Sequence, residues 1–146
     1  MSAVTVSARV PGTVEAARAL WTDVRRWPSF VDGFGHVVRQ DPGWPRSGAV
    51  VWQSTPHGRG RVVEHADGTV EDERLTGRQD VTFSPAEDGV EVTVHLDYRL
   101  RERSPLTPVV DRLFIRRAVR DALARTLRRY AIEAAADADL SASAGR

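Results

Sequence analysis

Four polar side chains are the best candidates for acid–base chemistry in this sequence: His36, Tyr98, Tyr130 and Arg74. An imidazole titrates near neutral pH, so His36 suits removal of a proton beside a carbonyl group. Tyr98 and Tyr130 each carry a phenol that can donate a hydrogen bond to a ligand carbonyl when the ring is buried. Each residue also has a structural interpretation: a histidine bonded to backbone or water, or a core tyrosine bonded to a backbone carbonyl. The sequence alone assigns a catalytic role to none of them.

Segment 69–76 has polar residues on both faces of the strand that it predicts. One interpretation is a solvated edge strand, whose charges prevent pairing with another sheet. The other places Asp72 and Arg74 as an ion pair inside a cavity, where the arginine binds a carboxylate or stabilises an enolate. We favour the edge strand.

The residue types that are missing exclude several kinds of chemistry. All 21 Lys and Arg positions are arginine, and the chain has no cysteine. It therefore has no Schiff-base amine, thiolate nucleophile, disulfide or thiolate zinc site. His57, His65 and Glu64 are too loosely spaced to predict a metal site. We expect neither a metal nor another cofactor, and any catalysis should be non-covalent acid–base catalysis.

The first elements that must position these residues are a strand and two helices. Alternating apolar residues predict a strand over about residues 4–10. Thr13 is the predicted N-cap of a helix that runs to about Arg26. Trp27-Pro28 should end it, because the residue before proline is disfavoured in a helix. A second short helix or a turn, rich in aromatic residues, is expected over 29–34.

Six further strands follow, most of them separated by turn residues typical of hairpins. They are expected at about 35–41, 48–55, 59–66, 69–76, 78–84 and 89–101. The last strand has the clearest alternation, with apolar residues from Val90 to Leu100 on one face. The patterns of 59–66 and 69–76 do not settle which of their faces is buried.

Thr107-Pro108 predicts the start of a long C-terminal helix, with an N-cap followed by proline at the first helical position. It should end at about Ala136, before a flexible tail over 137–146. An antiparallel meander cannot cover its own apolar face, so this helix must cover it. The predicted fold is α+β: a seven-stranded curved antiparallel sheet wrapped around a long C-terminal helix, with two short helices after the first strand. We expect a single ligand-binding domain over residues 1–136.

A cavity between this sheet and helix would be lined by inward-facing residues. Arg39 should face solvent, which would turn His36, Val38 and Gln40 inward. The aromatic candidates come from the second short helix, two strands and the inward stripe of the long helix. The predicted ligand-binding residues are Trp52, Tyr98, Tyr130, His36, Arg74, Phe30 and Phe34.

Three segments in this element order resemble the START-like (SRPBCC) superfamily: Trp27-Pro28-Ser29-Phe30, Trp52-Gln53-Ser54-Thr55-Pro56 and Asp97-Tyr98-Arg99-Leu100. Within it, the chain is similar to the bacterial polyketide cyclase/dehydrase and lipid-transport group over roughly residues 3–135. The resemblance implies a helix-grip fold with a deep cavity under the C-terminal helix. It implies binding of lipids, sterols, polyketides or other apolar molecules, and in some members aldol cyclisation and aromatisation of polyketides. It transfers no catalytic residue to this chain.

Three functions are compatible with these observations. The first is binding of a small hydrophobic, lipid- or polyketide-like molecule in the cavity. The alternative is a polyketide cyclase/aromatase-type enzyme that uses His36, Tyr98 or Arg74 in the same cavity. The third is an interaction module formed by the arginine-rich face of the last helix, which would bind an anionic membrane surface or nucleic acid. The sequence shows no interleaved exposed aromatics or recognition motif there, so a solvated face is favoured.

Charge and hydropathy limit the partners. The net charge of +1 gives no strong field to attract nucleic acid, which we do not expect as a partner. The N-terminus lacks the pattern of a signal peptide, and no apolar stretch approaches the roughly 20 residues that span a bilayer. We therefore expect a cytoplasmic protein without stable membrane insertion. A homodimer remains open.

Overall fold

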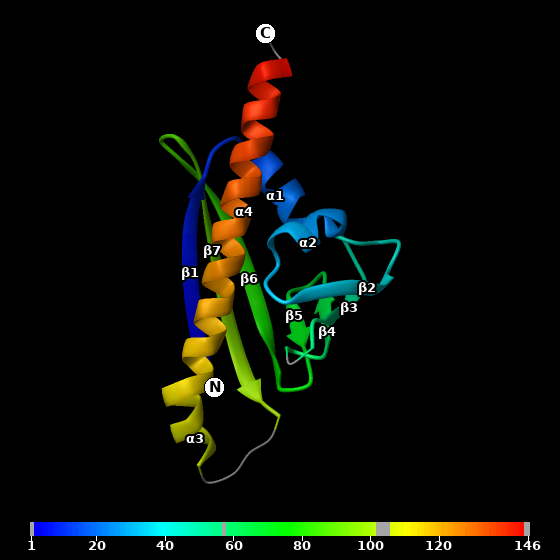
Figure 1. Cartoon of the computed structure of the whole chain (residues 1–146), viewed down its shortest axis with the longest axis vertical. Helices are drawn as coiled ribbons and strands as arrows, with labels where there is room; N and C mark the ends of the chain where they lie inside the picture. The colour runs from blue at the N-terminus through cyan, green and yellow to red at the C-terminus, as the bar shows by residue number, and fades with distance from the viewer. Residues whose placement is uncertain (1, 57, 102–105, 145–146) are drawn as a thin grey trace. The chain divides into compact units, whose positions relative to one another are not determined.

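Strands and a long C-terminal helix account for most of the computed structural model, which describes residues 2–56, 58–101 and 106–144 (Figure 1). In these residues seven strands form one antiparallel sheet in the order β1-β7-β6-β5-β4-β3-β2. The strands are β1 (Ser2–Val10), β2 (Phe34–Gln40), β3 (Ala49–Ser54), β4 (Arg61–His65), β5 (Thr69–Glu71), β6 (Leu75–Ala86) and β7 (Gly89–Leu100). The predicted α+β fold class is confirmed.

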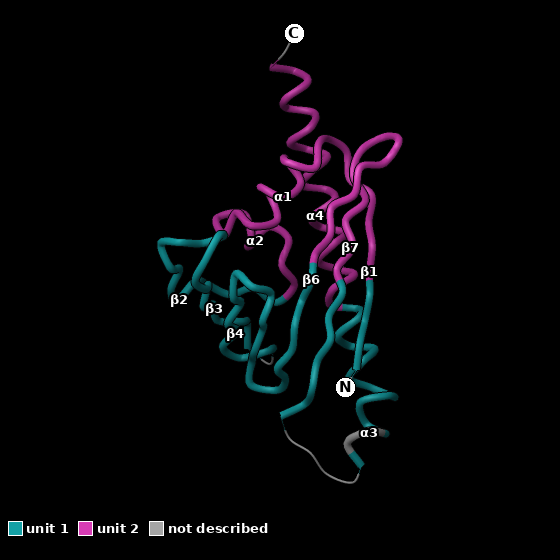
Figure 2. Tube along the Cα trace, turned by 180° about the vertical axis from the view of Figure 1, so that it is seen from behind, with its two compact units in different colours: residues 1–5, 33–80, 95–121 teal, residues 6–32, 81–94, 122–146 magenta. Residues whose placement is uncertain are grey.

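The chain forms two compact units, each built from three separate segments (Figure 2). Unit 1 contains residues 1–5, 33–80 and 95–121, and unit 2 contains residues 6–32, 81–94 and 122–146. Strand β7 contributes buried residues to both, because Val90, Val92, Val94, Leu96 and Tyr98 are all at most 3% exposed. The alternation predicted for this strand is therefore confirmed.

The first helix, α1 (Val14–Thr22), begins where the sequence predicts and ends earlier. The Thr13 side chain caps it by accepting a hydrogen bond from the Ala16 N–H at 3.1 Å. The predicted end at Arg26 is wrong, because Asp23 starts a separate 3₁₀ turn (Val24–Arg26) and its side chain accepts a hydrogen bond from the Arg25 N–H.

Helix α2 (Trp27–Phe30) includes the Trp27-Pro28 pair that was expected to end α1. Pro28 lies in the first turn of α2, where the missing N–H of proline costs no helical hydrogen bond. The second short helix therefore exists, but it begins two residues before the predicted segment 29–34.

Segment 69–76 is not an edge strand. The short strand β5 pairs with β4 on one side and β6 on the other, so it lies inside the sheet. Asp72 breaks the predicted strand, because its Oδ1 accepts hydrogen bonds from the backbone N–H groups of Arg74 and Leu75 at 2.8 and 2.9 Å. These bonds turn the chain into β6. The ion pair considered between Asp72 and Arg74 is replaced by one between Asp72 and Arg59.

The C-terminal helical segment consists of α3 (Thr107–Val110), a π-helical turn (Asp111–Ile115) and α4 (Arg116–Ala144). The segment begins at Thr107, and the side chains of Thr107 and Pro108, on which the predicted cap rests, lie outside the described part. Helix α4 continues past Ala136, the predicted end, through residues assigned to a flexible tail.

Two ion pairs accompany this longer helix within unit 2. The Arg26 guanidinium binds Glu133 at 2.6 Å and Asp137 at 3.0 Å, and Asp137 is the first residue of the predicted tail. The surrounding alanines also favour helix more than most residue types do. Composition suggested a tail here, whereas helix propensity and a distant arginine favour the helix.

Candidate ligand-binding site

Five residues of unit 1 form a mixed aromatic and charged group that we call the Trp52 cluster: Phe34, Trp52, Arg59, Glu64 and Asp72. Trp52 lies opposite Val62 in the β3–β4 ladder, which places Trp52 and Glu64 on one face of the sheet. The Trp52 indole is buried and donates a hydrogen bond from Nε1 to Glu64 Oε2 at 2.7 Å. The Phe34 ring stacks against it, with 5.2 Å between ring centroids.

Glu64 is the most unusual ionisable group of this cluster. Burial raises the pKa of the Glu64 carboxyl, because the charged form loses hydration, while Arg59 and the Trp52 hydrogen bond act in the opposite direction. The residue nevertheless remains only half-buried. Glu64 thus combines a desolvated carboxyl with a residue that is not fully enclosed, a combination typical of functional sites.

Arg59 brings a positive charge next to the indole. Its Cζ lies 5.6 Å from the centroid of the Trp52 ring, within reach of a cation–π interaction. Its Nε donates to Asp72 Oδ2 at 2.8 Å, and the Asp72 side chain is only 1% exposed. Arg101 Nε also donates to the backbone carbonyl of Asp72 at 2.7 Å. Asp72 therefore positions Arg59 through a carboxylate that the turn before β6 already holds.

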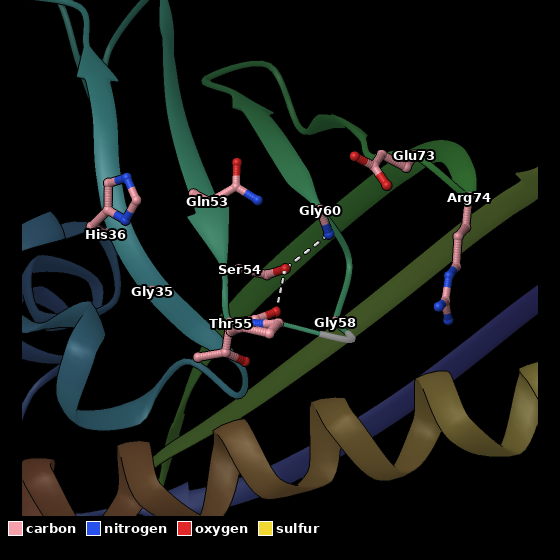
Figure 3. A pocket seen from close by; sticks show the side chains of 10 residues that line it. Gly35, His36, Gln53, Ser54, Thr55, Gly58, Gly60, Glu73 and Arg74 are labelled. Atoms are coloured by element: carbon pink, nitrogen blue, oxygen red, sulfur yellow. Dashed lines mark hydrogen bonds between the residues drawn. The ribbon is translucent and has the colours of Figure 1, made fainter.

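A hollow of about 710 Å³ lies at the end of the β3–β4 hairpin (Figure 3). Two predicted residues, His36 and Arg74, both line it, and both are exposed. The described residues around it are largely polar or glycine: Gly35, His36, Gln53, Ser54, Thr55, Pro56, Gly58, Gly60, Glu73 and Arg74.

A serine and a glycine shape this hollow. The Ser54 hydroxyl accepts a hydrogen bond from the Gly60 N–H at 2.8 Å and donates one to the Thr55 carbonyl at 3.2 Å (Figure 3). Gly60 has φ +74°, a conformation that residues with a Cβ rarely adopt, and a Cβ there would also meet the Glu73 carboxyl group. Any larger residue at this position would strain the backbone and displace Glu73 from its place in the hollow.

The predicted inward orientation of His36 is wrong. Phe34 pairs with Ser54, but a register shift follows and His36 pairs with Gln53. Directly paired residues share a face, so His36 lies on the face opposite Trp52. The β-bulge reverses the alternation until a second shift, between Val37 and Arg39, restores it. Neither shift leaves a mark in the apolar pattern of an exposed edge strand. His36 and the Trp52 cluster therefore do not act on one ligand from the same face.

Tyr98 is buried as predicted, but its hydroxyl already has a protein partner. It donates to Asp111 Oδ1 at 2.6 Å, and Asp111 also accepts a hydrogen bond from the Ser2 hydroxyl. Burial raises the pKa of the Tyr98 phenol above its ordinary range, and the bond to Asp111 raises it further. The phenol is thus fixed in its neutral form within unit 1.

Phe30 and Tyr130 meet in unit 2, together with Trp21. The ring centroids are 5.4 Å apart for Phe30 and Tyr130, and 5.3 Å apart for Trp21 and Tyr130. The Tyr130 hydroxyl donates to the Ala17 carbonyl at 2.5 Å. Burial raises the pKa of this phenol as well. The structural interpretation of Tyr130, a core tyrosine bonded to a backbone carbonyl, describes what is observed.

Glu64 was missing from the predicted site, although it follows Trp52 on the next strand. Strand β4 has a valine on each face, Val62 and Val63, so its alternation does not identify the buried face. His57, considered with His65 and Glu64 for a metal, lies outside the described residues. Among the residues that the structure does describe, no three His, Asp or Glu side chains lie together as a metal site would require.

The sequence of the chain matches the family model described as "Polyketide cyclase / dehydrase and lipid transport" over residues 1–134. The chain belongs to this family. The resemblance inferred from the three sequence segments is thereby confirmed. No curated protein matches the chain.

Several solved structures share the fold of this family member at low sequence identity. A protein from Thermus thermophilus, TTHA0849, is 15% identical and has a TM-score of 0.66, with 88% of this chain and 94% of that one covered. A START superfamily protein from Mycobacterium smegmatis is 14% identical with a TM-score of 0.64, covering 90% and 97%. The di-domain ARO/CYC StfQ of the steffimycin biosynthetic pathway is 18% identical with a TM-score of 0.61, covering 90% and 50%. These likenesses establish the helix-grip fold.

Proposed function

We propose that the chain binds a small apolar molecule with at least one hydrogen-bonding oxygen, and that the Trp52 cluster binds that oxygen. The observation that carries the proposal is Glu64, a half-buried residue whose desolvated carboxyl accepts the hydrogen bond of the Trp52 indole. Small-molecule sites combine apolar walls with a few placed polar groups, and the cluster sets two aromatic rings beside three charged side chains. Family membership supports a ligand of lipid or polyketide type.

Each member of the cluster has a distinct part in this proposal. The half-buried Phe34 ring, stacked on the buried Trp52 indole, provides an apolar wall for a ring or chain. A protonated Glu64 donates a hydrogen bond to a ligand carbonyl, and an ionised Glu64 accepts one from a hydroxyl. Arg59 offers a positive charge beside that oxygen while Asp72 holds it in place. Tyr98, Tyr130 and Phe30 then serve the protein core.

The alternative function is a polyketide cyclase/aromatase-type enzyme, and the same carboxyl favours it. Glu64 would remove a proton from the carbon beside a ligand carbonyl, and Arg59 would stabilise the enolate that forms. Attack of this carbon on a second carbonyl closes a ring, and Glu64 returns the proton to the resulting alkoxide. One fold relative is an ARO/CYC protein. Binding is the simpler proposal because it requires only the contacts described above.

Thermal unfolding with defined compounds tests the proposal. Palmitic acid, cholesterol and the hydroxyanthraquinone emodin represent the three ligand types, and a ligand that binds the native state raises Tm with its concentration. We expect at least one to do so, and Glu64→Leu, which removes both the donor and the acceptor, to reduce that shift. The matched control Glu91→Leu, at an exposed strand carboxylate of unit 2, should keep it. A panel without any shift would contradict the proposed function, and equal shifts in wild type and Glu64→Leu would remove Glu64 from the site.

A further inference from the structure

The start of the C-terminal helical segment exposes apolar side chains that a folded chain usually covers. Val109 and Val110 are 54% and 41% exposed, and Leu113 and Phe114 are 58% and 66% exposed. They lie within two turns of helix, so they form one patch and are not isolated surface residues. No exposed aromatic was expected among the arginines of this helix, and Phe114 corrects that expectation.

Four exposed arginines accompany this patch: Arg112, Arg116, Arg117 and Arg120. None of them forms an ion pair with another described residue, whereas Arg125 and Arg129 on the same helix both bind Asp32, at 3.0 and 3.3 Å. We call the four apolar residues and these four arginines the basic apolar surface.

Two acidic residues accompany these arginines and do not offset their charge: Asp121 is a single exposed carboxylate beside four arginines, and Asp111 is bonded elsewhere. Asp111 accepts hydrogen bonds from Tyr98 and Ser2, so its carboxylate is turned into unit 1. The segment thus presents four positive charges and exposed apolar groups on the side away from Asp111. This combination of apolar side chains with flanking arginines is what binds helices to the interface of anionic bilayers.

We propose that the basic apolar surface docks the protein onto an anionic lipid membrane. Leu113 and Phe114 would enter the headgroup region, and the arginines would contact lipid phosphates. A second copy of the chain is a poorer occupant, because a two-fold interface would place these arginines against each other. Docking would be peripheral, since no helix within the described residues is long and apolar enough to cross a bilayer. This inference does not depend on the proposed ligand.

Co-sedimentation with vesicles tests the inference. The full chain is mixed with vesicles of phosphatidylcholine alone or of phosphatidylcholine with phosphatidylglycerol. We expect binding to the anionic vesicles only, and weaker binding at high salt. The triple variant Arg112→Gln/Arg117→Gln/Arg120→Gln should bind on the order of a hundredfold more weakly, from about 1 kcal/mol per arginine. Leu113→Ser/Phe114→Ser should also weaken binding, by at least about tenfold.

Matched controls distinguish binding through this surface from non-specific binding. Ile132→Ser and Leu140→Ser remove equally exposed apolar residues elsewhere on α4, and Arg128→Gln removes an exposed arginine. These variants should bind anionic vesicles like the wild type, and circular dichroism should find all variants folded. Three results would overturn the proposal. The protein could bind both vesicle types equally, or the triple variant could bind like the wild type. Single-stranded RNA could also displace the protein from the vesicles. A wild-type dimer that Leu113→Ser/Phe114→Ser converts to a monomer would overturn it in favour of self-association.

Discussion

Each unit has an aromatic group, and the two groups differ in what surrounds the rings. In unit 2, Trp21, Phe30 and Tyr130 pack edge to face or stacked, and the one hydroxyl is bonded to a backbone carbonyl. In unit 1, Phe34 and Trp52 stack beside a carboxyl with a raised pKa and a guanidinium. The one hydroxyl of the first group is bonded within the core, whereas the second group contains ionisable side chains that are not fully buried.

This difference distinguishes packing from chemistry among residues that the sequence treats alike. Phe30, Phe34, Trp52 and Tyr130 were all predicted ligand contacts, because each is aromatic and expected on an inward face. A buried ring alone does not mark a site, since rings dominate cores as well. A desolvated carboxyl does, because burying a charge costs free energy that core packing does not require.

The largest expected effect is loss of the unit 2 aromatic group. Phe30 is 1% exposed and contacts two other rings, so Phe30→Ala should lower the free energy of unfolding by about 3–5 kcal/mol. Urea denaturation measures this. Any Phe30→Ala protein that remains folded at low temperature should bind ligand like the wild type, and selective loss of ligand binding would contradict a purely structural role.

A smaller loss of stability is expected from Asp72→Asn, which neutralises the carboxylate that accepts hydrogen bonds from two backbone N–H groups and from Arg59. We expect the free energy of unfolding to fall by about 2–3 kcal/mol, because the carboxylate is buried and its hydrogen bonds are charge-assisted. Asp80→Asn is the matched control: its pair with Arg78 is also through Nε, at 3.1 Å, but both side chains are about half exposed. The free energy of unfolding of this control should fall by less than about 0.5 kcal/mol. Equal losses at both sites would contradict the role assigned to Asp72.

The smallest effect is the pH dependence that Glu64 contributes. Because its pKa is higher in the folded chain than in the unfolded one, the folded state holds the proton to higher pH. Its contribution to stability is therefore complete below the unfolded pKa and is lost as pH rises through the folded pKa. Relative to wild type, Glu64→Gln should become more stable as pH rises from about 4 to about 8. Urea denaturation at several pH values measures this, and a constant difference would contradict a raised pKa.

Sequence patterning predicts this fold well where one face of an element is uniformly apolar. The alternation from Val90 to Tyr98 and the Thr13 cap are both found as expected. Patterning fails where a β-bulge or a single side chain redirects the backbone. The register shift after Phe34 turns His36 to the other face, and the Asp72 carboxylate ends β5 early. Neither event changes the apolar content of its segment.

The candidate site is less predictable than the fold for a related reason. Phe34 and Trp52 could be chosen as aromatic residues, but Glu64 becomes a candidate only once the pairing of β3 and β4 is known. Valines on both faces of β4 conceal that pairing. The paired residues Asp72 and Arg59 are 13 residues apart in sequence, so no local motif joins them.

The indole N–H resonances provide the most direct test of the Trp52 cluster as the ligand site. The chain has four tryptophans, including Trp52 in the cluster and Trp21 in the unit 2 core. Two-dimensional ¹H–¹⁵N NMR, with assignments from Trp52→Phe and Trp21→Phe, follows both indoles while the compound with the largest thermal shift is added. We predict that the Trp52 resonance moves, because its hydrogen bond to Glu64 is perturbed, while that of Trp21 stays in place. A saturable shift of Trp21 with an unmoved Trp52 would contradict the assignment.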